Sequence, residues 1–274
     1  MSCSALRFLA FALCPLSGCV AYNEQCQALV DNPSEKVATL GADLWLDRPN
    51  ARHAPNALGQ AVADSFVDVF AASAKPVDFA VLNGGSLRAE GLCGVTRNIV
   101  RANATGLTNG VLHEILLFEN LVNAVDLTED EVMAVMEHSV ERLFAVPAPI
   151  ISPAGSFLHV SKEVQLVVDC SRPPLSRITS LRIKGELVEK PGRVNKRFRM
   201  ALSEFLLGGG DGYTMLAGPG KDPTRSPQLA QRFGGVDSNI AADYLRKNKI
   251  VDPLKLDPLR MDLQNCAKSV APSN

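Results

Sequence analysis

Residues 77–88 read Val77-Asp-Phe-Ala-Val-Leu-Asn-Gly-Gly-Ser-Leu-Arg88, and they indicate the architecture of this 274-residue chain more directly than any other segment. The run from Val77 to Leu82 is short and mostly apolar, which is typical of a buried strand. Asn83-Gly84-Gly85 follows with the chemistry of a turn. Arg88 is therefore predicted to project from the C-terminal edge of a sheet, where open α/β sheets bind their ligands.

The remaining pattern intersperses helices with strands. A helix is predicted to begin at Asn56, because apolar residues recur on one face behind it, and Thr128-Glu-Asp-Glu131 is a capping box for another. A last helix is predicted to be capped by Ser238. Strand composition occurs in Phe157–Val168, Ile178–Ile183 and Phe198–Phe205. We expect one domain over residues 30–265, of α+β (mixed α/β) class, with a layered mixed sheet and packed helices.

Three arginines stand beside predicted turns. Arg48 and Arg52 are four residues apart, just ahead of the helix start at Asn56, and Arg88 follows the glycine turn. The planar guanidinium donates two parallel hydrogen bonds to a phosphate, and the N–H groups of a helix start also favour anions. These residues predict a phosphate clamp; the alternative for each is a solvated surface charge.

Two phenylalanines could stack on a base. Phe118 is followed by the polar pair Glu119-Asn120, and Phe205 is followed by a glycine-rich segment that contains Asp211. Such rings bind a base by stacking, and a carboxylate in a loop can accept hydrogen bonds from a ribose. The alternatives are core packing for the rings and simple turns for the glycines. No Lys-Ser/Thr follows these glycines, so the segment is not a phosphate-binding P-loop.

Several functions are disfavoured by what the sequence lacks. Four scattered histidines, His53, His113, His138 and His159, form no metal-binding pattern and are interpreted as structural. There is no G-x-S-x-G nucleophile motif. With 28 basic and 29 acidic residues, the chain has no excess charge that would attract a nucleic acid polymer.

Taken in order, these segments resemble the C-terminal domain of the bacterial 5'-nucleotidase/UDP-sugar hydrolase family over nearly all of residues 40–262. Asn83-Gly-Gly-Ser-Leu-Arg88 is similar to the family's N-G-G-G-I-R, Phe118-Glu-Asn120 to its P-F-G-N, and Phe205…Gly209-Gly-Asp-Gly-Tyr213 to its F-x-x-x-G-G-D-G-Y. Ala57-Leu-Gly59 stands where the family has N-L-G. Ser86, Leu117, Glu119 and Ala57 depart from the pattern, and Glu119 adds an acidic side chain beside the expected base site.

The resemblance implies a division of labour. In the family, an N-terminal metallophosphatase domain holds two divalent metals and hydrolyses the substrate, whereas the C-terminal domain binds the nucleotide. Carried over, Phe118 and Phe205 stack on the base, Asp211 faces the ribose, and the clamp arginines face the phosphate. Asn83 and Asn120 are expected to be polar contacts near the base or sugar. No residue of this chain is expected to be catalytic or to bind a metal or other cofactor.

The N-terminus resembles a targeting segment. Residues 1–18 have the short apolar core of a signal peptide, and Leu16-Ser-Gly-Cys19 resembles the bacterial lipoprotein box, with Cys19 as the lipidated residue. Valine after this cysteine favours the outer membrane. We expect export to the periplasm or cell surface, with membrane contact through the lipid anchor only. The alternatives are an ordinary secretory signal and a start codon assigned too early.

Four further cysteines, Cys26, Cys93, Cys170 and Cys266, permit two disulfides in three connectivities. Because domain termini are often close together, the expected pairs are Cys26–Cys266 and Cys93–Cys170.

Fewer than 30 residues separate Cys19 from Arg48, too few for a catalytic domain. The leading hypothesis is therefore a nucleotide-binding subunit that works in nucleotide catabolism with a separately encoded metallophosphatase. The alternative is a stand-alone lipoprotein that binds nucleosides or nucleotides without catalysis. A third hypothesis is that the chain has lost its ancestral function and retains only a structural role.

Overall fold

A four-stranded sheet lies at the centre of the computed structural model, which describes residues 21–90, 92–94, 96–145, 154–217 and 235–267. In sheet order its strands are β6 (Val122–Thr128), β11 (Arg197–Ser203), β3 (Phe79–Asn83) and β7 (Leu158–Val160). β11 and β3 run parallel, and the two outer strands are antiparallel to their neighbours. The predicted mixed sheet is therefore present, with the strand of the opening segment inside it.

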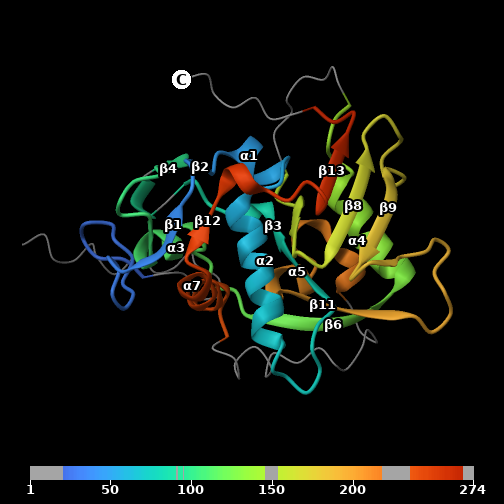
Figure 1. Ribbon diagram of the computed structural model, residues 1–274, viewed down its shortest axis with the longest axis horizontal. Coiled ribbons are helices and arrows are strands. Elements are labelled where there is room, and N and C mark those ends of the chain that lie inside the picture. Colours follow the sequence, from blue (N-terminus) through green and yellow to red (C-terminus); the bar gives the residue numbers. More distant parts are fainter. Residues whose placement is uncertain (1–20, 91, 95, 146–153, 218–234, 268–274) are drawn as a thin grey trace, which may run out of the picture.

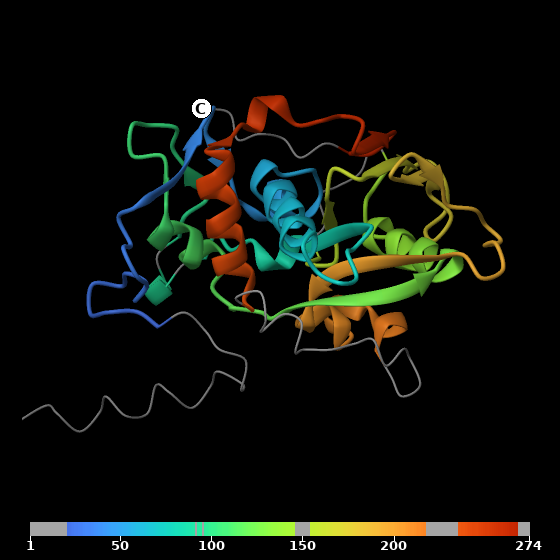
Figure 2. The same ribbon diagram turned by 60° about the horizontal axis from the view of Figure 1, so that its bottom comes forward.

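Both faces of this sheet are buried, which explains the continuous apolar run of β3. Ala80 and Leu82 belong to one hydrophobic core, and Phe79 and Val81 belong to the other. Helices α2 (Ala57–Phe70) and α7 (Asp237–Asn248) cover the first face and lie side by side in Figures 1 and 2. Helix α4 (Glu129–Val140) contributes to the second core.

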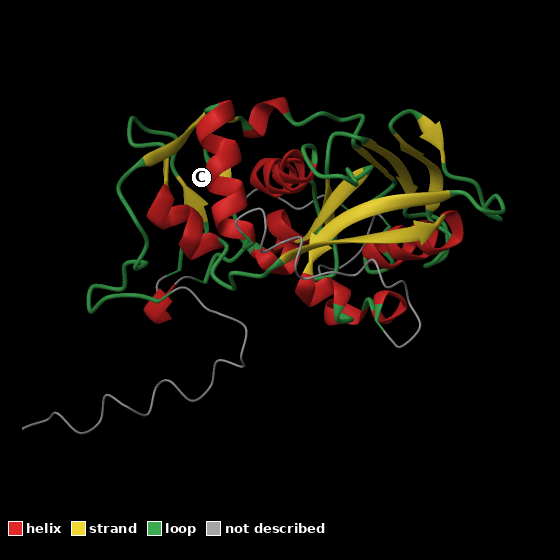
Figure 3. Cartoon of the chain, turned by 90° about the horizontal axis from the view of Figure 1, so that it is seen from below, coloured by secondary structure: helices red, strands yellow, loops and turns green. Residues whose placement is uncertain are grey.

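Smaller sheets flank the centre on opposite sides, as Figure 1 shows. On one flank lie β12 (Ile250–Val251), β1 (Lys36–Leu40) and β5 (Leu107–Thr108), together with the pair β2 (Leu44–Trp45) and β4 (Ile99–Val100). On the other lie β10 (Glu186–Leu187), β9 (Ile178–Ile183), β8 (Val164–Asp169) and β13 (Met261–Gln264). The short helices are α1 (Arg48–Arg52), α3 (Asn109–Ile115) and α5 (Glu204–Leu207), with 3₁₀ turns at Gly84–Ser86 (η2), Leu92–Gly94 (η3), Gly210–Gly212 (η4), Thr214–Leu216 (η5) and Pro253–Lys255 (η6). Figure 3 shows how helices and strands intersperse; no helix among the described residues is long and apolar enough to cross a bilayer.

Two of the three predicted helix starts are confirmed. The Asn56 side chain caps α2 by accepting from the N–H groups of Leu58 and Gly59, and Thr128 and Glu131 form the predicted reciprocal capping box. The prediction that Ser238 caps the last helix is wrong. α7 begins one residue earlier, at Asp237, and its N-cap is Val236.

The predicted strand Ile178–Ile183 is confirmed as β9 with the same bounds, whereas the other two predicted runs are longer than the strands that they contain. The run from residue 157 to 168 contains two strands, β7 and β8, which belong to different sheets. The run from residue 198 ends at Ser203, whose hydroxyl accepts from the N–H of Leu206 and so begins α5. Phe205 therefore lies on a helix and not on a strand. Within residues 20–45, β1 and β2 form without a sequence pattern that predicted them.

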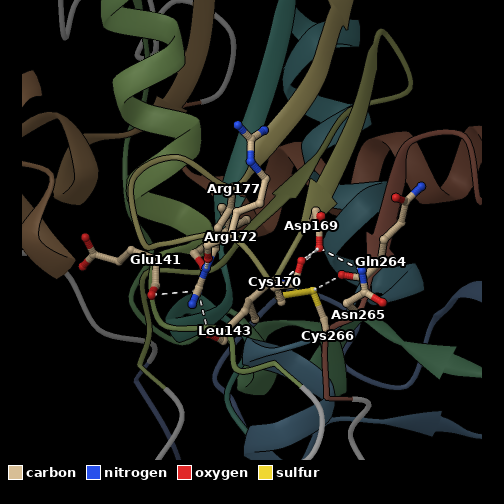
Figure 4. The surroundings of a disulfide bond; sticks show 11 residues. Glu141, Leu143, Asp169, Cys170, Arg172, Arg177, Gln264, Asn265 and Cys266 are labelled. Atoms are coloured by element: carbon tan, nitrogen blue, oxygen red, sulfur yellow. Dashed lines mark hydrogen bonds between the residues drawn. A yellow bond between two sulfur atoms is a disulfide. The ribbon is translucent and has the colours of Figure 1, made fainter.

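The favoured disulfide pairing is wrong. Cys26 pairs with Cys93 and Cys170 with Cys266, with Cα–Cα distances of 5.8 and 4.9 Å. The reason is topological: β13 runs parallel to β8, so the cysteines that follow these two strands become neighbours, and the Cys170 N–H donates to Gln264 O at 3.0 Å (Figure 4). The first described residues lie on the opposite flank from β13 (Figure 1), so the segments that hold Cys26 and Cys266 do not meet.

Candidate functional site

Arg48 and Arg52 are the first and last residues of α1. Because they are four residues apart on a helix, their side chains leave the same face. Their position ahead of α2 was predicted, but the helix that they themselves form was not. The start of α2 is not open to an anion as expected, because the Asn56 side-chain oxygen already accepts from Leu58 N–H (3.0 Å) and Gly59 N–H (3.4 Å).

His159, from β7, fixes the junction between α1 and α2. Its Nε2–H donates to the carbonyl of Ala51 at 2.9 Å, and its Nδ1 accepts from the N–H of Asn56 at 3.4 Å. Burial lowers the pKa of His159 to about 4, which agrees with a neutral ring that has one donor and one acceptor nitrogen. Any side chain at Gly59 would collide with this ring. The glycine that matches the family's N-L-G is therefore needed for the histidine that holds α1.

Two of the three predicted clamp arginines, Arg48 and Arg88, contact one carboxylate, that of Glu90, and the charge of Arg52 also acts on it. Arg48 donates from Nε (3.0 Å) and Nη2 (2.7 Å) to Glu90 Oε1, and Arg88 Nη2 lies 3.5 Å from Oε2. The hydrogen bond from Arg48, and then the charges of the three arginines, lower the pKa of Glu90. Burial and then the charges of Arg88 and Arg48 lower the pKa of Arg52. The cluster is thus a local concentration of positive charge in a chain with net charge −1.

Arg88 also joins this cluster to the predicted base site. Its guanidinium carbon lies 5.3 Å from the centroid of the Phe118 ring, within the range of a cation–π interaction. Its backbone N–H donates to Ile115 O at 3.1 Å, which ties the glycine turn to the end of α3. The Nε of Arg88 is buried, and the described part of the chain offers it no acceptor. Arg88 therefore combines a buried donor that has no acceptor with a cation–π contact to Phe118.

Asn83, from the Asn83–Arg88 motif, and Asp211, from the Phe205–Tyr213 motif, are in direct contact. Asn83 Nδ2 donates to Asp211 Oδ2 at 2.7 Å, while Ser86 Oγ donates to Asn83 Oδ1 at 2.6 Å. The serine that departs from the family's glycine thus orients the asparagine. A side chain at Gly85 or Gly155 would press on the Asp211 carboxylate, at 3.1 and 2.7 Å from Oδ2. These glycines are needed for close approach.

His138, on α4, holds the Asp211 loop from behind. Its Nε2–H donates to the carbonyl of Asp211 at 2.9 Å, and its ring packs edge-on against Tyr213 with centroids 4.5 Å apart. Asp211 has a φ of 51°, a left-handed conformation that a side chain rarely adopts without support. The Tyr213 hydroxyl donates to Ser156 O at 2.5 Å. Sequence reasoning treated this histidine as structural and did not assign it this positioning role.

Phe205 lies on α5 with its ring packed on Gly210. The residue is 44% exposed, and any side chain at Gly210 would collide with its ring. One side of the ring is therefore covered by backbone, while nearly half of the residue faces solvent. This is the geometry of a stacking platform.

Asn120, which is expected to be a polar contact near the base or sugar, is bonded to the first residue of α7. It is buried; its Nδ2 donates to Asp237 Oδ2 at 3.3 Å, and its carbonyl accepts from the Asp237 N–H at 2.9 Å. These bonds tie the segment after Phe118 to the start of α7. Glu119, between Phe118 and Asn120, has a backbone φ of 49°, a left-handed conformation that glycine adopts without strain. This conformation explains why the family has glycine at this position.

The structure thus connects the predicted residues into two linked groups. The first group contains the arginines, which surround Glu90, and Phe118, which contacts Arg88. The second is the hydrogen-bonded pair of Asn83 and Asp211. The two groups are linked because the charge of Asp211 also acts on Arg52. Phe205 joins through the glycine loop, whereas Asn120 contacts α7. Glu90 was missed, although an acidic residue two positions after Arg88 was a usable signal. Within the described ranges, no group of three or more His, Cys, Asp or Glu side chains could hold a metal ion.

Comparisons with known proteins identify the family of this chain. A sequence profile of the 5'-nucleotidase C-terminal domain matches residues 36–218. The bovine (Bos taurus) 5'-nucleotidase is 26% identical over 65% of the chain and 27% of that protein. An apyrase from Aedes albopictus is 29% identical over 77% of the chain and 33% of that protein. The 5'-nucleotidase precursor of Thermus thermophilus superposes with a TM-score of 0.63 at 24% identity, over 84% of this chain and 40% of that one.

The chain therefore belongs to the 5'-nucleotidase C-terminal domain family, and the predicted α+β class is confirmed. The identity to the Thermus structure is low, so that likeness shows the fold alone. The chain spans about a third or less of these two curated relatives.

Proposed function

We propose that this chain binds a nucleotide or nucleoside as the substrate-binding domain of a 5'-nucleotidase-type phosphohydrolase. The observation that carries the proposal is the convergence of Arg48, Arg52 and Arg88 at one point, with Arg88 reaching over the Phe118 ring. In this proposal the arginines bind phosphate and the two phenylalanines stack on the base. Asp211 accepts from the ribose through Oδ1, since its Oδ2 already accepts from Asn83.

Hydrolysis in this proposal requires a separate metallophosphatase that supplies two divalent metals, so that the pair acts in nucleotide catabolism. Support comes from the relatives, in which a stretch matching this chain is only part of a longer 5'-nucleotidase. The alternative is a binding protein without catalysis, which needs no such partner.

The binding proposal is tested by calorimetric titration of the purified chain with adenosine and AMP, without added metal. A Phe118→Ala, Phe205→Ala double variant should bind both ligands at least about tenfold more weakly, because each stacked face contributes about 1–3 kcal/mol. Leu187→Ala is a matched control, since Leu187 is 41% exposed but lies on β10, outside the site. Unchanged affinity in the double variant would refute base stacking on these rings.

Catalytic partnership is tested by adding the chain to purified two-metal phosphatases encoded beside it. A rise in kcat/KM for AMP hydrolysis that the double phenylalanine variant does not produce would support the subunit hypothesis. Tight nucleoside binding with no gain in hydrolysis from any such phosphatase would favour the stand-alone binding protein.

We further propose export, with Cys19 as a lipidated anchor after a signal peptide of residues 1–18; these residues lie outside the described ranges. The two disulfides support an oxidising compartment. Snake venom 5'-nucleotidases among the relatives also support export. Mass spectrometry of the mature N-terminus tests the anchor, because a Cys19→Ser variant should lose the lipid and leave the membrane fraction.

A further inference from the structure

Glu90 occupies the position that an anionic ligand of the arginine cluster would take. Both of its oxygens face guanidinium groups, Oε1 toward Arg48 and Oε2 toward Arg88. Arg48 donates two hydrogen bonds to a single oxygen, so the face of its guanidinium that would clasp a phosphate is already engaged. A carboxylate of the chain itself therefore holds the cluster together.

This carboxylate can be displaced. The side chain of Glu90 is 43% exposed and that of its main partner, Arg48, is 52% exposed. By contrast, Glu129 is fully buried and receives hydrogen bonds from both the backbone and the side chain of Arg193. Exposed ion pairs contribute little to stability, so releasing Glu90 requires little free energy.

Charge determines what replaces it. With Glu90 in place, the three guanidinium groups and the carboxylate carry a net charge of +2, since 3 − 1 = 2. A phosphate that enters must either expel the carboxylate from Arg48 or bind beside it against like-charge repulsion. A nucleoside brings no charge and meets neither penalty.

We propose that Glu90 is a selectivity residue that competes with the ligand's phosphate for Arg48 and Arg88, and so lowers affinity for nucleotides relative to nucleosides. This inference rests on the proposed nucleotide-binding function. Its chemistry, a carboxylate that mimics and excludes phosphate, concerns the arginine cluster alone. Inorganic phosphate therefore tests it independently of the base site.

The experiment is calorimetric titration of wild type, Glu90→Gln and a control, Glu35→Gln, with inorganic phosphate, AMP and adenosine. Glu35 matches Glu90 because it is an exposed carboxylate that accepts two hydrogen bonds from one arginine, Arg246, at 3.0 and 2.8 Å. Glu90→Gln should raise the affinity for phosphate and AMP about tenfold, which lies between the effect of one close unit charge in bulk water and its larger effect near a protein surface. It should leave adenosine affinity within about twofold, and the control should change none of the three.

The two proposals fail in different ways. Absence of adenosine binding in all three proteins would count against the nucleotide site, while the phosphate titration would still decide the role of Glu90. Phosphate and AMP affinities that stay equal or fall in Glu90→Gln would overturn the selectivity role. Glu90→Ala, with circular dichroism to verify folding of each variant, repeats the test without an amide that could replace the carboxylate's contacts.

Discussion

Asp237 should make the stability of this protein fall as pH rises through neutrality. It is the first residue of α7, is 1% exposed, and accepts hydrogen bonds from Asn120 Nδ2 at 3.3 Å and Ser238 N–H at 2.8 Å. Burial, aided by the nearby charge of Glu119, raises the pKa of Asp237 from 3.8 to about 7, against the lowering effect of these hydrogen bonds. The carboxyl group that fastens the Phe118 segment is thus largely protonated in mildly acidic solution.

The sign follows from proton linkage. Because the folded pKa exceeds the unfolded pKa, the folded state binds more protons between about pH 4 and pH 7. The stability contribution is fully present below the unfolded pKa and is lost as pH rises through the folded pKa. The two pKa values differ by about three, which at about 1.4 kcal/mol per unit sets a maximum near 4 kcal/mol for the change in the free energy of unfolding. Asp237→Asn, which cannot ionise, should remove this dependence.

Urea unfolding between about pH 5 and 8, followed by the fluorescence of the single tryptophan, Trp45, measures the effect. The free energy of unfolding of wild type relative to Asp237→Asn should fall by roughly 2–4 kcal/mol over this range. Taking the difference removes the opposite trend from His159, whose folded pKa of about 4 makes stability rise with pH up to about 6.5. Asp243→Asn, on an exposed turn of the same helix, should parallel wild type. Parallel curves for Asp237→Asn and wild type would refute the reasoning.

Two further predictions concern the scaffold of the site. Gly84→Ala places a Cβ against the carbonyl of Ala51, so α1 must move. We expect a free energy of unfolding lower by about 1–3 kcal/mol and weaker AMP binding. The control, Gly208→Ala, meets only contacts of 3.4 Å or more and should lose far less stability. Replacing Cys170 and Cys266 by alanine opens a loop with a sequence separation of 96, which should lower the free energy of unfolding by about 4–5 kcal/mol; a urea midpoint unchanged from the oxidised wild type would contradict this.

Sequence alone could predict the elements whose causes are local. The starts of α2 and α4 follow from the side chains of Asn56 and Thr128, which bond to N–H groups two or three residues ahead. The strand β3 follows from an apolar run that both cores require. In each case, the residues that determine the element lie within it or next to it.

Features that depend on distant neighbours could not be predicted. The break after β11 depends on one hydroxyl, that of Ser203, within a run whose composition still favours a strand. The disulfide pairing depends on β13 lying beside β8, which is a property of the sheet order and not of cysteine spacing. The five-residue helix α1 depends on His159, which is 108 residues away from the carbonyl that it binds.

The same distinction applies to the candidate site. The sequence motifs point to the residues that project into it, because a resemblance preserves residue types in order. The motifs do not indicate the residues that support these side chains, such as His138, which is 73 residues from Asp211 and has no neighbouring pattern of its own. Two glycines, Gly59 and Gly210, match family positions in the sequence. The reason for glycine there is visible only in the structure, where the rings of His159 and Phe205 lie against them.

The charges around these residues give the proposed pocket a direction. Positive charge is concentrated at the end where Arg48, Arg52 and Arg88 meet, and Glu90 there is the group that an anion would replace. Glu119, which follows Phe118 in the chain, is acidic, and its charge acts on the buried carboxyl group of Asp237. In the proposed binding mode, this charge distribution favours a ligand whose phosphate lies at the arginine end.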